Sequence, residues 1–317
     1  MSDRQHIQFG SLLCSVEEDS GHWAEILAEV NGTPLFAPID DSAIGLKIRF
    51  QERTDLSIRG NDELNLEPTS DGFVLDSDPL NIRLQLKAPC PEAIFEVKQP
   101  KMPREQLGFH IWLVTNRMLI LLDRMLLHCA AIEMDGLVAL FCGRRGAGKS
   151  TISISLAQAG ATILAEDHVI LRHVQGDYSI SGCTSRVRVT AKTEEHLLPG
   201  QLKSAPLDVG GVDKKDFPAE QFYRSLPYID RKPDLLLLSR VGEKFAVSDL
   251  PKSEALIQLM KVTGEMLRFS SHRDYETFFD TLAGFVQTVP TFSLELSPDL
   301  SHLGGLHEWL QQYPKRD

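Results

Sequence analysis

Residues 137–151, LVALFCGRRGAGKST, give the clearest indication of the fold class. Its first part, Leu137–Cys142, is an unbroken apolar run, which is typical of a buried strand. The part that follows has a glycine, four further residues and then Gly-Lys-Ser, which is the pattern of a phosphate-binding loop. Apolar residues then recur at helical spacing over residues 152–159, and Gly160 ends the pattern. Strand, loop and helix in this order predict an α/β domain that binds a nucleoside triphosphate.

Each residue type in the loop has an expected task. Glycines let successive backbone N–H groups turn inward toward phosphate oxygens, and the following helix adds the positive end of its dipole. We expect Lys149 to bridge the β- and γ-phosphates of ATP and the Ser150 hydroxyl to bind the accompanying Mg²⁺. The alternative is a glycine-rich turn that binds nothing. Arg144 and Arg145 could add positive potential beside the triphosphate or could point to solvent. The predicted nucleotide-binding residues are Gly143, Arg145, Gly146, Ala147, Gly148, Lys149, Ser150 and Thr151.

Composition excludes several classes of function. The 317 residues carry a formal net charge of −11 without a long basic stretch, which argues against a nucleic-acid partner. The apolar stretch over residues 111–127 is interrupted by charged residues, and residues 1–10 hold no apolar signal core, so we expect neither membrane spanning nor secretion. The cysteines show no CxxC spacing and indicate reduced thiols of a cytoplasmic protein. They are Cys14, Cys90, Cys129, Cys142 and Cys183.

Two domains are expected from the length and from a change of pattern near residue 100. Up to that point apolar residues alternate with polar ones, as over residues 46–51 and 80–87, so residues 1–100 read as a β-rich N-terminal module. After Pro103, apolar residues from Leu107 to Met125 step by three and four along one face of a long helix. Asp135-Gly136 between apolar runs predicts a hairpin that leads into the loop. Residues 101–317 would form the second domain.

An acidic pair follows the next predicted strand, residues 162–165. Glu166 and Asp167 stand at its carboxyl end, where ligands bind in open α/β sheets. One carboxylate there would hold Mg²⁺, and the other would accept the proton of an attacking hydroxyl. We expect this strand to neighbour the loop strand. His168 is interpreted as a bystander, because adjacent strand residues point to opposite faces. His128, at the start of the hairpin, is by itself more typical of a structural residue.

Residues 127–171 resemble the kinase domain of HPr kinase/phosphorylase. In that family a histidine precedes a hairpin and the loop, and a strand that ends in an acidic pair follows the loop helix. The matching residues here are His128, the loop, Gly160 and Ile163-Leu164-Ala165-Glu166-Asp167. The resemblance implies a PEP carboxykinase-like nucleotide-binding fold. It also places His128 near the transferred phosphate, makes Glu166 the general base and assigns Asp167 to the metal. The family has aspartate where this chain has Glu166.

Outside this core the chain resembles a looser branch of HPr-kinase-like proteins, which includes kinases of lasso-peptide precursors. The segment that recognises the carrier protein in true HPr kinases is not recognisable in this chain. The resemblance implies ATP- and Mg²⁺-dependent phosphorylation of a serine in a peptide or protein, such as a biosynthetic precursor peptide. Arg186, Arg188, Lys214 and Lys215 fall where relatives carry basic residues, and ordinary solvated charge explains them equally well.

Two other functions remain open at this stage. The same residues would serve a kinase of a small metabolite, or a nucleotide-binding regulatory module with little transfer activity. The longer side chain of Glu166 leaves the regulatory module in play, whereas Lys149, Ser150 and the acidic pair favour an enzyme. The sequence leaves the acceptor and the oligomeric state undecided, and a homo-oligomer is among the options.

Overall fold

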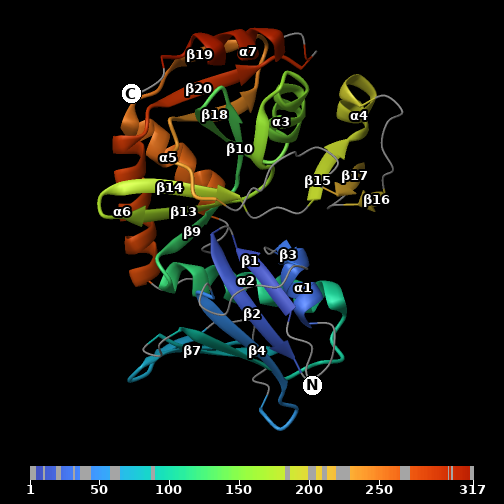
Figure 1. Ribbon diagram of the computed structural model, residues 1–317, viewed down its shortest axis with the longest axis vertical. Helices are drawn as coiled ribbons and strands as arrows, with labels where there is room; N and C mark the ends of the chain where they lie inside the picture. Colours follow the sequence, from blue (N-terminus) through green and yellow to red (C-terminus); the bar gives the residue numbers. More distant parts are fainter. Residues whose placement is uncertain are drawn as a thin grey trace. The chain divides into compact units, whose positions relative to one another are not determined.

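The structure is a computed structural model of mixed α/β type with several β-sheets (Figure 1). It describes residues 5–9, 11–18, 23–30, 33–35, 44–57, 65–86, 90–182, 186–198, 205–208, 213–218, 229–264, 272–298, 300 and 303–314. The chain divides into two compact units. The first comprises residues 1–125 and 266–276, and the second comprises residues 126–265 and 277–317.

The first unit is built on an eight-stranded sheet in the order β3-β1-β2-β4-β8-β7-β6-β5. The pairs β2–β4 and β4–β8 are parallel, and the other pairs are antiparallel. The predicted alternation is confirmed, because Leu46, Ile48 and Phe50 are buried in β4. The elements are β1 (Gln5–Phe9), β2 (Leu12–Glu18), α1 (Trp23–Val30), β3 (Thr33–Leu35), β4 (Leu46–Glu52), β5 (Asn65–Pro68), β6 (Gly72–Asp76), β7 (Leu80–Gln85), β8 (Glu92–Val97) and α2 (Arg104–Leu121).

The predicted long helix after Pro103 is α2, and its buried stripe includes Leu107, Ile111 and Met118. The helix ends earlier than the pattern predicted. Asp123 has a positive φ of 56°, which turns the chain out of the helix, and Met125 belongs to the following strand. Apolar spacing continued past the turn because Met125 is buried in that strand instead.

The second unit contains a six-stranded sheet in the order β12-β10-β11-β18-β20-β19 and smaller sheets in the orders β14-β13-β9 and β15-β17-β16. The pairs β11–β18 and β18–β20 are parallel. The elements are β9 (Arg124–Leu127), β10 (Cys129–Met134), β11 (Leu137–Cys142), α3 (Lys149–Gln158), β12 (Thr162–Ala165), β13 (Val169–Val174), β14 (Asp177–Gly182), β15 (Arg186–Thr190), α4 (Ala191–Leu197), β16 (Ala205–Asp208), β17 (Asp213–Pro218), β18 (Leu235–Val241), β19 (Ala246–Asp249), α5 (Lys252–Thr263), α6 (His272–Thr288), β20 (Thr291–Leu296) and α7 (Leu303–Gln312).

The hairpin β10–β11 is confirmed. Asp135 and Gly136 both have positive φ, 52° and 82°, as a tight hairpin turn of the primed type requires. The hairpin also corrects the expected sheet order, because β12 pairs with β10, which lies between β12 and the loop strand. Since β10 is antiparallel to both neighbours, β12 and β11 run in the same direction and their carboxyl ends share one edge. The acidic pair therefore still lies at the edge where the loop begins.

Helices α3 and α7 bury their apolar sides against the six-stranded sheet (Figure 1). Ile152 and Leu156 of α3 and Leu306 and Leu310 of α7 join one apolar cluster with the residues of β10, β11 and β18. This packing fixes the start of α3 relative to the end of β11, and so fixes the loop between them.

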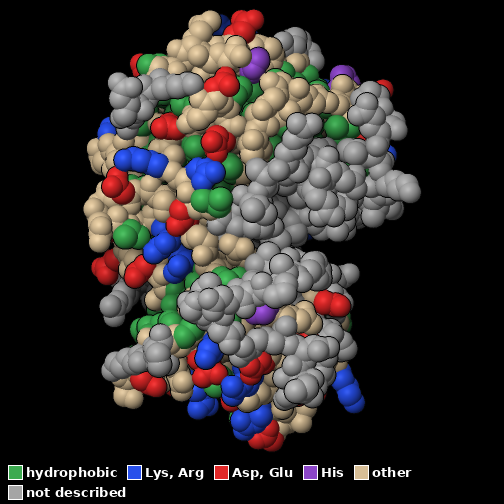
Figure 2. Space-filling model, in the orientation of Figure 1, with side chains coloured by type: hydrophobic (Ala, Val, Ile, Leu, Met, Phe, Trp, Pro, Cys, Tyr) green, Lys and Arg blue, Asp and Glu red, His purple; other side chains and the backbone are tan. Residues whose placement is uncertain are grey.

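On the face drawn in Figure 2, acidic and basic side chains are interspersed among polar ones. Among the described residues, no helix is both long enough and apolar enough to cross a bilayer.

Candidate functional site: the phosphate-binding loop and the β12 edge

The loop leaves β11 at Cys142 and ends where α3 begins at Lys149. Gly146 and Gly148 have φ of 83° and 84°, a left-handed conformation that side chains disfavour, and Gly148 is the N-cap residue directly before α3. A Cβ on Gly143 would lie 2.5 Å from the carbonyl oxygen of Ser239 and 2.7 Å from Cβ of Ala147. Gly146 and Gly148 are therefore required for their backbone conformation, and Gly143 is required because no side chain fits. Both requirements fit a backbone that curls around a phosphate group.

Lys149 lies inside this loop, with 7% of its surface exposed. Its Nζ donates to the carbonyl oxygen of Gly143 at 2.8 Å and lies 3.0 Å from Nε2 of His128. An ammonium group only donates, so Nε2 of His128 accepts, and a neutral His128 carries its proton on Nδ1. That nitrogen lies 3.3 Å from Oδ1 of Asp167. Lys149, His128 and Asp167 thus form a connected chain of polar contacts.

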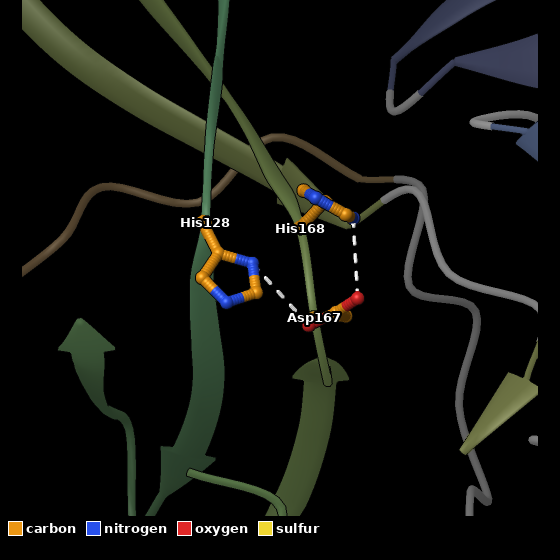
Figure 3. Close-up of side chains that lie close together, drawn as sticks. All are labelled: His128, Asp167 and His168. Carbon is orange, nitrogen blue, oxygen red and sulfur yellow. Dashed lines mark ion pairs between the residues drawn. The ribbon is translucent and has the colours of Figure 1, made fainter. Parts of the chain in front are cut away.

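The acidic pair stands in a bend directly after β12. Glu166 is nearly enclosed, with 2% of its surface exposed, whereas 32% of the Asp167 side chain is accessible. The Asp167 carboxylate lies between two imidazoles, because its Oδ2 is 3.6 Å from Nδ1 of His168 (Figure 3). The two histidine rings are 5.3 Å apart between centroids.

The interpretation of His168 as a bystander is wrong. It assumed that residues 166–168 continue the strand and alternate between faces. The strand ends at Ala165 and the chain bends, which brings His168 to the same side as Asp167. Because of the same bend, Glu166 is buried while the Asp167 side chain remains partly accessible.

The charges around Asp167 favour its ionised form. Burial alone would raise its pKa, but the neighbouring His168, His128, Lys149 and Arg188 together lower it to about 2. For His168, burial lowers the pKa and outweighs the opposite pull of Asp167. At neutral pH the cluster therefore presents a carboxylate beside a neutral His168 imidazole.

The first turn of α3 contains the remaining predicted nucleotide-binding residues. Ser150 is half-buried at the second position of the helix, where a hydroxyl would meet a cation bound to phosphates. The Thr151 hydroxyl lies 2.8 Å from that of Thr193 in α4, so it links the two helices. Thr190 caps α4 through its own hydroxyl, which accepts from the backbone N–H of Thr193.

ATP and Mg²⁺ fit these features: a glycine-shaped loop, a helix start, a buried ammonium, a hydroxyl and a carboxylate.

A pocket of ≈ 340 Å³ adjoins the loop on the side of β18 and α5. Its walls carry Arg144, Arg145, Arg240 and Lys261, and Gln258 adds an amide. No local sequence pattern predicts that β18 and α5 border the loop, because this contact depends on strand pairing with residues far along the chain. The lining residues are Cys142, Gly143, Arg144, Arg145, Gly146, Ala147, Leu238, Ser239, Arg240, Val241, Gln258, Lys261 and Val262.

The basic residues proposed from the resemblance differ in their surroundings. Arg188 in β15 contributes to the field at Asp167 and His168. Lys215 forms an ion pair with Glu194 at 2.5 Å, so its charge is partly satisfied within the unit. Arg186 and Lys214 occupy β15 and β17, and their side chains lie outside the described residues.

The expectation of reduced thiols is wrong for Cys129 and Cys142. These residues face each other across β10 and β11 with 4.4 Å between their Cα atoms, and they form a disulfide. The spacing is that of a non-hydrogen-bonded pair, in which side chains approach most closely. The expectation rested on the absence of short CxxC spacing, whereas a hairpin brings together cysteines that are 13 residues apart in sequence. Cys14 and Cys90 are free, and Cys183 lies outside the described residues.

Part of the chain is similar to known kinases. It is 34% identical over 68 residues to the HPr kinase/phosphorylase of two strains of Leptospira biflexa serovar Patoc, a match over 22% of this chain and 21% of each relative. The chain thus spans about a fifth of the length of these curated relatives. A solved Hpr(Ser) kinase/phosphatase from Coxiella burnetii overlaps 59% of this chain and 94% of its own, with a TM-score of 0.29 and 11% identity. No family model matches the chain. The resemblance to HPr kinase/phosphorylase therefore extends over part of the sequence.

Proposed function

We propose that this protein is an ATP-dependent phosphotransferase that acts on a hydroxyl group. The observation that carries the proposal is the convergence of the Lys149 ammonium, His128 and Asp167 at the end of the loop. A loop alone would bind a nucleotide, but these groups add charge where a transferring phosphoryl group would lie. The partial identity to HPr kinase/phosphorylase supports the same reaction class.

In this proposal the nucleotide's phosphates bind the loop N–H groups and Lys149. Mg²⁺, when bound with the nucleotide, would be held by Ser150 and Asp167 and would neutralise phosphate charge. Glu166 takes the proton of the acceptor hydroxyl as its oxygen attacks the γ-phosphorus. The bond from the γ-phosphorus to the bridging oxygen breaks, ADP leaves, and the acceptor becomes a phosphate ester. His128 and Lys149 stabilise charge on the transferring group.

We assign the acceptor as a serine of a peptide or protein, such as a biosynthetic precursor peptide. The ribose and base of the nucleotide would occupy the pocket between the loop and α5. That pocket is continuous with the loop through Gly143–Ala147, and its basic side chains would suit the phosphates of a nucleotide that extends from the loop into the pocket.

One observation favours a second candidate, a nucleotide-binding regulatory module with little transfer. A general base must come within about 3 Å of the proton it accepts, and Glu166 is only 2% exposed. In the enzyme reading, substrate binding has to open the bend at residues 166–168. In the regulatory reading, Glu166 stays enclosed and nucleotide occupancy alone changes partner affinity.

The test uses the full chain, γ-labelled ATP and Mg²⁺ with a panel of serine-containing peptides, and separately with small alcohols. Label transferred to a peptide serine supports the proposed kinase. Label transferred only to a small alcohol replaces the peptide assignment with a metabolite kinase. Nucleotide binding by calorimetry without label on any acceptor overturns the kinase proposal and favours the regulatory module.

A further inference from the structure

We propose that His128, Asp167 and His168 form a binding site for a divalent transition-metal ion, with nitrogen ligands that Mg²⁺ does not favour. The site shares His128 and Asp167 with the proposed kinase site and in that respect rests on the proposed function. Its occupancy is nevertheless a separate property, because it requires no nucleotide. The proposed metal site also includes His168, which has no role in the proposed phosphate transfer.

The geometry carries the proposal. One ligand atom from each residue, the two imidazole nitrogens and a carboxylate oxygen, lies within 4.8 Å of the others (Figure 3). Asp167 is 3.3 Å from Nδ1 of His128 and 3.6 Å from Nδ1 of His168. Two ligands of a tetrahedral ion with bonds of 2.0–2.1 Å are about 3.4 Å apart. Small rotations of the side chains would thus close three ligands around one ion.

The ligand set points to the kind of ion. Imidazole suits zinc, copper, iron and nickel, whereas Mg²⁺ prefers oxygen ligands in an octahedral shell. Two histidines and one carboxylate, with a position left for water or a phosphate oxygen, are the donor set of several zinc and iron centres. All three residues belong to the second unit, at the shared edge of β10 and β12.

Lys149 competes with the ion for His128. In the structure the ammonium occupies Nε2, which leaves the proton on Nδ1. An ion bound at Nδ1 moves that proton to Nε2, where it faces the Lys149 ammonium, so the contact has to break. The ion and the Lys149–His128 contact therefore exclude each other. Metal binding releases Lys149 toward the phosphates, and a nucleotide that recruits Lys149 without placing Mg²⁺ on Asp167 in turn favours the ion.

The experiment titrates chelator-treated, nucleotide-free protein with Co²⁺, followed by its visible absorption, and with Zn²⁺ by competition. We expect one ion per chain. His168→Ala and Asp167→Asn should each weaken binding at least about tenfold, as loss of even a supporting contact typically does. Lys149→Met should strengthen binding, because it removes the competing donor and a positive charge. His196→Ala, at an exposed histidine of α4, is the matched control and should bind as the parent does.

Equal Co²⁺ affinity in the parent and His168→Ala would overturn the proposal, and so would weaker binding in Lys149→Met. A chain that binds ATP with Mg²⁺ in calorimetry but takes up no Co²⁺ disproves the transition-metal site and leaves the proposed kinase intact. A chain that binds Co²⁺ with the expected pattern but does not transfer phosphate supports the metal site and counts against the kinase.

Discussion

The ammonium nitrogen of Lys149 lies 3.0 Å from Nε2 of His128, a residue 21 positions earlier in the chain. The same imidazole meets Asp167 through its other nitrogen at 3.3 Å. His128 thus connects Lys149 of the loop to Asp167, which follows the end of β12. If phosphates draw Lys149 away, as the proposed function implies, His128 would lose one partner and keep the other, so nucleotide binding would reach Asp167 through one side chain.

Lys149→Met should weaken ATP binding by about ten- to a hundredfold. The ammonium makes charge-assisted contacts to phosphate, and a hydrogen bond to a charged group contributes about 1.5–3 kcal/mol. Calorimetric titration with ATP and Mg²⁺ measures the change. Lys192→Met serves as the control, because Lys192 lies in α4 and donates to the carbonyl of Pro298. If Lys149→Met bound ATP as tightly as the parent, the loop would not be the nucleotide-binding site.

Glu166→Gln should leave ATP affinity within about twofold and lower phosphate transfer by about 10²–10⁴-fold, the usual contribution of a general base. The amide has the same shape and preserves packing at this nearly enclosed position, but it cannot accept the proton. Glu166→Asp keeps the carboxylate on a shorter arm and should retain part of the activity. The readout is initial-rate labelling of the acceptor at saturating ATP. Parental rates in Glu166→Gln would reassign the base.

Lys261→Glu should weaken ATP binding if the pocket beside α5 holds the nucleotide. The substitution turns a basic wall residue into an acidic one next to an anionic ligand. Lys252→Glu makes the same charge change on the same helix at a residue that does not line the pocket. We expect an effect of about tenfold or more for Lys261→Glu and little for Lys252→Glu at physiological salt. Equal effects of the two substitutions would indicate long-range charge alone and would mean that the adenine base does not bind in this pocket.

Gly143→Ala should damage the loop without removing any ligand. Its new Cβ would lie 2.5 Å from the carbonyl oxygen of Ser239, a backbone atom of β18, so β11 and β18 must separate locally. Such overpacking typically costs about 1–3 kcal/mol. We expect a lower melting temperature and weaker ATP binding. Gly304→Ala is the control, because an added Cβ there meets nothing within 4 Å in α7.

Local sequence patterns predicted the core of the site well. The strand β11, the tight turn at Gly136, the helix α3 and the strand β12 all form where apolar runs and turn residues indicated. Each is decided by residues close in sequence, through periodicity and backbone conformation. The acidic pair follows from the same patterns, because a strand end fixes where the next residues lie.

The rest depends on contacts between distant residues. Strand β18 lies beside β11 although it begins at Leu235, and no local pattern specifies that pairing. The basic pocket and its Lys261 therefore could not be predicted. The alternation of a strand predicts the wrong side for His168, because the chain bends after β12 and His168 lies beside Asp167. Cys129 and Cys142 meet because of hairpin register, which spacing rules for cysteine do not consider.

Asp167→Asn should make the pH dependence of stability shallower in the acid range. His168, His128, Lys149 and Arg188 outweigh burial and lower the Asp167 pKa to about 2, below its unfolded value of about 3.8. Because the folded value is the lower one, the carboxylate contributes stability fully above pH 4, and this contribution is lost as the pH falls toward 2. Denaturant unfolding of parent and variant from pH 7 to pH 3 measures the gap between them. The gap should be largest near neutral pH and should shrink below pH 4. A gap that stays constant would mean that the Asp167 charge does not stabilise the folded chain.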